Sequence, residues 1–290
     1  MLAETDLGMA EETFDSSAAP DRVDAPARSP GGAPAGGGER GGFVSVPPGP
    51  LSPFHRDLLA LRRRLIRAGN VAIDMLEASI WALWNNDKDL AADIRRRDDA
   101  VDDEEVAIER ECLRLMTLQQ PYGQDFRALA FCLKVNADIE RVADHATSLA
   151  KVTLQLEDEE SPSWPVALVE IGDRIPEMCQ NLMRSVLEED VEGARSLITK
   201  DSVIDRLDKR LFTEIIDWIK RDADNAELGL LCYRVGRELE RVGDLLGNIA
   251  EDVVYLATGK IIRHQHKGRP APGSGPEPGA AGPGRIADSA

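Results

Sequence analysis

The hydrophobic pattern is clearest near the C-terminal end of the chain, where apolar side chains recur every three or four residues. This series comprises Leu228, Leu231, Val235, Leu239, Val242, Leu246, Ile249, Val253 and Leu256. Such spacing places these side chains along one face of an α-helix. It therefore predicts a single amphipathic helix of about eight turns.

The same helical periodicity recurs throughout residues 54–256, where no segment alternates apolar and polar residues as a half-buried strand would. Clusters of Asn, Asp, Gly and Pro interrupt it and mark turns. The predicted helices span roughly 54–84, 88–117, 124–155, 166–187, 191–220 and 225–257. Pro176 indicates a kink or a later start in the fourth helix. We expect an all-α fold of two tandem three-helix bundles.

The two predicted bundles are related by an internal duplication. Residues 131–151 and 231–251 are identical at seven of 21 positions, and an offset of 103 residues aligns the region 72–112 with the second copy without a gap. A unit of about a hundred residues is too long for a solenoid repeat, and two copies are too few to form one. The aligned acidic pairs are Glu140 and Glu240, Asp144 and Asp244, Asp98 and Asp201, and Asp102 and Asp205.

Both ends of the chain differ in composition from the repeated region. Residues 1–52 and 259–290 are rich in Gly, Pro, Ala and Ser. Such segments bury too little apolar surface to offset the entropy of ordering. We expect a disordered extension over 1–52 and a disordered tail over 259–290. Between them we place the first repeat at 53–156 and the second at 165–258.

Charge and apolar run length narrow the class of protein. The formal net charge is −17 at pH 7; the first 53 residues contribute −5 and the last 32 contribute +3, which leaves −15 on residues 54–258. This argues against nucleic-acid binding and favours cations or basic partners. No apolar run reaches the ~18–20 residues of a membrane span, and the N-terminus lacks a signal-peptide layout. We expect a cytoplasmic protein whose four cysteines are buried and reduced.

Helical geometry places the repeated acids at or beside the buried faces. At ~100° per residue, Asp98 and Glu105 lie about 20–40° from the apolar stripe of their helix, and Asp102 lies near 80°. Glu240 and Asp244 lie at the flank of the stripe on theirs. An isolated pair of acids one turn apart is usually a solvated face. Carboxylates inside a stripe between helices need a partner, a metal or an opening to solvent.

The recurrence of these acids in both copies favours cation binding. Carboxylates one turn apart can chelate together, and two adjacent helices can supply four or more oxygens. Oxygen ligands suit Mg²⁺, Mn²⁺, Ca²⁺ or iron better than a thiolate zinc site. The Glu-x-x-His spacing of carboxylate di-iron bundles is absent. We therefore expect an open surface site rather than a buried oxidase centre.

Several segments of the chain closely resemble PhoU proteins, which are bacterial regulators of phosphate uptake. Residues 109–115 and 133–146 resemble the first half of these proteins, and residues 237–244 and 248–259 resemble the second half. The likeness spans about 54–264. It implies multinuclear iron or zinc clusters bound at the surface, with manganese or magnesium as the alternative. The metal ligands carried over by position are Glu140, Asp144, Glu240, Asp244, Asp98, Asp102, Asp201 and Asp205.

The resemblance also implies a role and partners. PhoU proteins act as negative regulators of phosphate uptake and of phosphate-starvation signalling. The chain is accordingly expected to be a non-enzymatic cytoplasmic adaptor that contacts the ATPase of the phosphate ABC transporter and the associated sensor histidine kinase. A homodimer is expected, peripheral to the membrane only through its partners, with no nucleic acid bound.

Two other hypotheses remain open from the sequence. A carboxylate-metal-dependent hydrolase would need an acid or base, for which His145 is the candidate, but the second copy has Leu245 there. A metal-free helical adaptor would use the acids only as ordinary surface. The sequence also departs from the family at Lys151, where an acid is usual, which weakens cation binding locally. The N-terminal extension is not a family feature.

Overall fold

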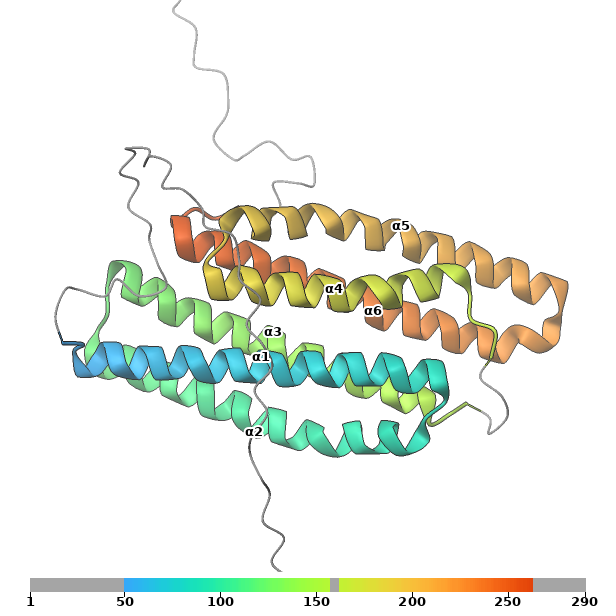
Figure 1. The fold of residues 1–290 in the computed structure, drawn as a ribbon, viewed down its shortest axis with the longest axis horizontal. Coiled ribbons are helices and arrows are strands. Elements are labelled where there is room, and N and C mark those ends of the chain that lie inside the picture. The colour runs from blue at the N-terminus through green and yellow to red at the C-terminus, as the bar shows by residue number, and fades with distance from the viewer. Residues whose placement is uncertain (1–49, 157–161, 263–290) are drawn as a thin grey trace, which may run out of the picture. The chain divides into compact units, whose positions relative to one another are not determined.

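A computed structural model describes residues 50–156 and 162–262, and the described part of the chain is helical (Figure 1). The two terminal segments predicted to be disordered lie almost entirely outside these residues. The elements are α1 (Pro53–Asn85), α2 (Lys88–Gln119), α3 (Gly123–Thr153), α4 (Val166–Glu188), α5 (Val191–Arg221), a short 3₁₀ turn η1 (Ala223–Asn225) and α6 (Ala226–Thr258). All six predicted helices are confirmed, with ends within three residues of the expected positions.

Short polar side chains fix where several helices begin. Ser52 accepts a hydrogen bond from the backbone N–H of His55 at 3.2 Å, and Asp87 accepts one from Leu90 at 2.9 Å. Asp190 does the same at the start of α5. These side chains satisfy amide groups that have no partner within the helix. The turn at Asn86 has a left-handed backbone, which stops α1 and lets the chain reverse into α2.

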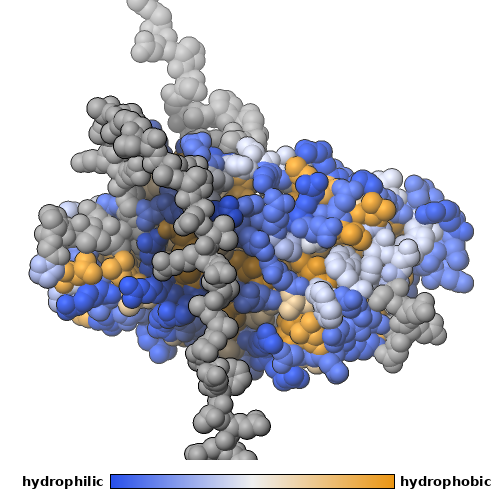
Figure 2. Space-filling view, in the orientation of Figure 1, coloured by the Kyte–Doolittle hydropathy of each residue, from blue (hydrophilic) through white to orange (hydrophobic). Residues whose placement is uncertain are grey.

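The helices pack as two bundles that share one hydrophobic core. Helices α1, α2 and α3 contact one another, as do α4, α5 and α6, and the bundles meet through α3 against α6 and α1 against α4 (Figure 1). The buried residues of both bundles form a single cluster. The face shown in Figure 2 is mainly hydrophilic, with smaller hydrophobic patches. No helix in the described part is long and apolar enough to cross a membrane.

Glycines allow close packing within and between the bundles. A Cβ added at Gly236 on α6 would lie 2.2 Å from Leu211 Cδ2 on α5, and one added at Gly172 on α4 would lie 2.6 Å from the Trp84 ring on α1. Of the two alternatives expected at Pro176, a kink or a later helix start, the later start is wrong. Helix α4 begins at Val166 and carries the proline in its interior. A helix tolerates such a proline when tertiary packing offsets the lost hydrogen bond.

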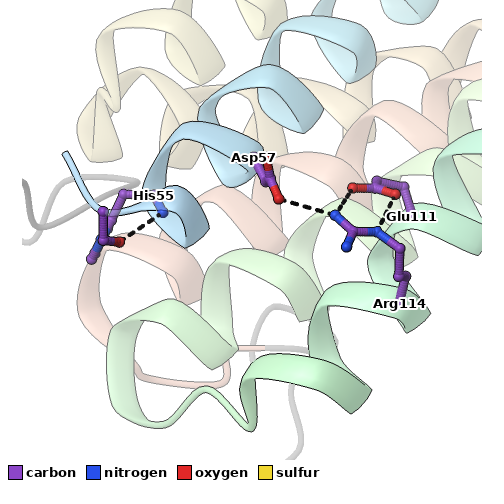
Figure 3. Close-up of polar contacts among 5 residues, drawn as sticks. His55, Asp57, Glu111 and Arg114 are labelled. Atoms are coloured by element: carbon purple, nitrogen blue, oxygen red, sulfur yellow. Dashed lines mark hydrogen bonds and ion pairs between the residues drawn. The ribbon is translucent and has the colours of Figure 1, made fainter.

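The PhoU-like segment at residues 109–115 has a structural role at one end of the first bundle. Arg114 donates to Asp57 on α1 at 3.0 Å and to Glu111 at 2.7 and 2.8 Å, which joins α1 to α2 (Figure 3). Cys112 and Leu115 are fully buried. The four cysteines of the chain are free and buried, as predicted.

Candidate metal centre

In the first repeat, five acids on the adjacent helices α2 and α3 form what we call the first acidic surface. Asp102 and Asp144 are exposed, whereas the other three are half-buried. Their charges act on one another across the two helices, because Glu140 is influenced by Asp102 and Asp98 by Asp144. The structure therefore brings together the four acids predicted for this copy. The members of the surface are Asp98, Asp102, Glu105, Glu140 and Asp144.

Burial and mutual repulsion disfavour the charged forms of these acids. Burial, with the neighbouring charges of Asp144 and Asp102, raises the pKa of Glu140 to about 7. Burial is also the main cause that raises the pKa of Asp98, although the nearby Thr147 hydroxyl and Lys151 oppose the change. The pKa of Glu105 is raised by burial and by Glu109 and Asp102. The surface would thus gain stability from a bound proton or cation.

The corresponding acids of the second repeat, which we call the second acidic surface, lie on α5 and α6. Asp205 and Asp244 are exposed, whereas Asp208 and Glu240 are half-buried. Burial raises the pKa of Glu240, and the charge of Arg237 opposes the rise. The prediction for Asp201 falls on a side chain outside the described part of the structure. The described members are Asp205, Asp208, Glu240 and Asp244.

Arg237 is a member of the second surface that sequence reasoning missed. Its Nη1 lies 3.1 Å from Glu240 Oε1 and 3.4 Å from Asp208 Oδ2, so one nitrogen joins acids on two helices. The spacing of Arg237 and Glu240, three residues apart in one helix, signals the first contact. The contact with Asp208 depends on how α5 packs against α6, which the sequence pattern does not give.

The acids of the two surfaces meet only part of what a metal ion requires. Within the described residues, no group of three or more His, Cys, Asp or Glu side chains lies close enough together to hold an ion. Three buried carboxylate oxygens nevertheless have no hydrogen-bond partner there: Asp98 Oδ1, Asp208 Oδ1 and Glu240 Oε2. Buried acceptors normally have partners. Both surfaces therefore offer oxygen acceptors of the kind that such a cation prefers, but their described side chains do not stand close enough together to form a coordination shell.

His145 makes its polar contact away from the first acidic surface. Its Nδ1 lies 2.7 Å from Glu238 Oε2 on α6, and both side chains are largely buried, at 14% and 13% exposed. This contact lowers the pKa of Glu238, mainly through the hydrogen bond itself. Lys134 on α3 pairs with the buried Asp252 on α6 across the same interface. The two repeats are thus joined by polar contacts between α3 and α6.

Fold and site together define a class of protein: an all-helical chain of two copies of one three-helix unit, each copy bearing an acidic surface. The PhoU domain family model matches residues 65–153 and 168–253. The Deinococcus radiodurans "Phosphate-specific transport system accessory protein PhoU homolog" is 36% identical over 185 residues, which is 64% of this chain and 87% of that protein. The homologue of the same name from Clostridium acetobutylicum is 30% identical over 72% of this chain and 96% of its own length.

Solved structures agree with these sequence matches. The crystal structure of PhoU from Pseudomonas aeruginosa superposes with a TM-score of 0.69 at 31% identity, covering 71% of this chain and all of that one. The phosphate transport system regulatory protein PhoU from Streptococcus pneumoniae gives 0.66 at 29% identity and covers 72% and 99%. The chain belongs to the PhoU family, and the resemblance in its sequence is confirmed.

Proposed function

We propose that this chain is a cytoplasmic accessory regulator of a phosphate-specific transport system and restrains phosphate uptake when phosphate is plentiful. The observation that carries the proposal is the match of both repeats to proteins named as accessory to that system, over most of their length. We further propose that it acts by docking, as a homodimer, on the transporter ATPase and on the sensor histidine kinase of phosphate starvation. The net charge of −17 favours basic docking surfaces on these partners.

Metal binding at the two acidic surfaces is the second part of the proposal. Glu140 and Asp144, with Asp98 and Asp102 on the adjacent helix, would hold a cation in the first repeat, and Glu240, Asp244 and Asp205 would do so in the second. Iron, zinc, manganese and magnesium all accept carboxylate oxygen, so the chemistry does not select one of them. Bound metal would neutralise part of the repulsion among these carboxylates.

A hydrolase built on the same acids is the less favoured alternative. Its general acid or base would have to reach the open coordination position. The contact of His145 with Glu238 counts against this role, since the imidazole is held at the interface with α6. Leu245, at the matching position of the second repeat, is buried and has no acid–base chemistry.

The regulatory proposal is tested in a strain that lacks the gene. Phosphate uptake and a phosphate-starvation reporter are measured in high phosphate, with the wild-type chain or a Glu140→Gln, Asp144→Asn, Glu240→Gln, Asp244→Asn variant supplied. We expect the deletion to derepress both readouts and the wild-type chain to restore repression. Normal repression in the deletion strain would overturn the proposal. Failure of the folded variant to repress would tie regulation to the acids, whereas full repression would make them ordinary surface.

Direct measurements separate the remaining parts of the proposal. Metal content of the tag-free protein, purified without chelator, should exceed that of the four-site variant. Mass from light scattering should give a dimer. Co-purification with the ATPase and the kinase should be lost at high salt, since exposed charge contacts are screened. Equal and negligible metal content in both proteins, even after reconstitution, would refute the metal site but leave the docking role to be judged by co-purification.

A further inference from the structure

The two acidic surfaces differ in one internal charge. In the second, the Arg237 Nη1 lies between Glu240 and Asp208, at 3.1 and 3.4 Å. The matching position of the first repeat is Ala137, which is exposed. No described basic side chain forms an ion pair with the corresponding acids Glu105 and Glu140. The duplication has therefore left Asp208 and Glu240 with an arginine between them, and the corresponding Glu105 and Glu140 without one.

Arg237 contacts one carboxylate on α5 and one on α6, which a metal held by both helices would also have to contact. A divalent ion that joins two adjacent helices has to lie between a carboxylate of each, and Arg237 already joins α5 to α6 there. Arg237 contacts only one oxygen of each carboxylate. The others, Asp208 Oδ1 and Glu240 Oε2, have no hydrogen-bond partner in the described structure. The acids can therefore still bind metal, but only in competition with the arginine.

The basic residue of the first repeat does not have the same effect. Lys151 is exposed and acts on Asp98. It lies 11 positions along α3 from Glu140, which is ~17 Å of helix. At that distance its charge is largely screened from Glu140 in physiological salt. Glu105 and Glu140, which correspond to the two acids that Arg237 contacts, thus have no described positive side chain that offsets their negative charge.

We propose that Arg237 is a built-in cation that regulates metal binding by the second repeat. Added divalent metal binds first to the first acidic surface and reaches the second only when it displaces the guanidinium. The two repeats are therefore unequal metal sites despite their common origin. This inference rests on the proposed metal-binding function and adds an order of filling to it.

A titration of the full-length, chelator-treated chain with Mn²⁺ tests the inference, with free Mn²⁺ read from its EPR signal. The wild type should show a tight and a weak class of site. Arg237→Ala should lower the dissociation constant of Mn²⁺ at the weak class of site by about tenfold. This is the effect expected when one unit of positive charge is removed a few ångströms from a divalent ion. Ala137→Arg, which transplants the cation, should weaken the tight class. Arg241→Ala removes an equal charge one turn away, beside Glu238, and should change neither class.

The outcomes distinguish this inference from the metal-binding proposal. Two equal classes in the wild type that Arg237→Ala leaves unchanged would overturn the role of Arg237 while metal binding stands. No bound Mn²⁺ in the wild type or in Arg237→Ala would overturn both. Circular dichroism confirms that each variant is helical. If Ala137→Arg fails to fold, the comparison of Arg237→Ala with Arg241→Ala still decides the question.

Discussion

Glu140 offers a direct test of the electrostatics of the first acidic surface, through the substitution Glu140→Gln. The ordinary pKa of a glutamate is 4.5, and burial with neighbouring acids raises that of Glu140 to about 7. Between these pH values the folded chain holds a proton that the unfolded chain has lost. The free energy of unfolding therefore falls as pH rises through this window. Glutamine imitates the protonated acid, so the free energy of unfolding of the variant should not fall in this window.

The magnitude follows from the size of the shift. About 1.4 kcal/mol for each unit of pKa, over a rise from 4.5 to about 7, gives an upper bound of about 3–4 kcal/mol at pH 8, and solvent screening at a half-buried site reduces it to about 1–2 kcal/mol. Urea denaturation of chelator-treated protein, followed by circular dichroism, should show Glu140→Gln more stable than the wild type by this amount at pH 8. Near pH 4 the two proteins should be equally stable.

The second repeat supplies the matched control for this experiment. Glu240→Gln also removes a repelled carboxylate, but it breaks the ion pair with Arg237 at 3.1 Å. We expect it to stabilise the chain less at pH 8, or to destabilise it. The reasoning would be refuted if Glu140→Gln destabilised the protein equally at both pH values, because the carboxylate would then have favourable partners in its charged form.

Two further predictions concern packing between helices and between repeats. Gly236→Ala should destabilise the fold by about 1–3 kcal/mol in urea denaturation, since the new Cβ would lie 2.2 Å from Leu211 Cδ2; Gly247→Ala, with open space around its Cβ, should be neutral or stabilising. His145→Leu should cost about 1–3 kcal/mol at pH 7 because the largely buried Glu238 loses its hydrogen bond with the imidazole and keeps only the longer contact with Arg241. The pKa of Glu238 is lowered, so the stability lost in His145→Leu should be present above about pH 4.5 and should vanish as pH falls further. An unchanged urea midpoint in Gly236→Ala, or in His145→Leu at pH 7, would contradict the packing described.

The sequence predicts the helices and the side of each helix that is buried, because both depend on local geometry. The caps at Asp87 and Asp190 mark helix starts, and a rotation of ~100° per residue correctly separates the half-buried Asp98 from the exposed Asp102. Contacts between helices are different, since they depend on how one bundle is rotated against another. The 93-residue separation of His145 and Glu238 leaves no local signal for their hydrogen bond. At Pro176 the sequence left a kink and a later helix start as alternatives for a related reason, because tertiary packing decides whether a helix continues through a proline.

The His145–Glu238 contact between α3 and α6 has a consequence for the duplicated chain: its halves are no longer interchangeable. A protein made of two second repeats would have leucine at position 145, and the largely buried Glu238 would lose its contact with the imidazole. One made of two first repeats would have aspartate at position 238, whose side chain is one methylene shorter and reaches less far towards the imidazole. The contact where the halves meet therefore requires one copy of each repeat.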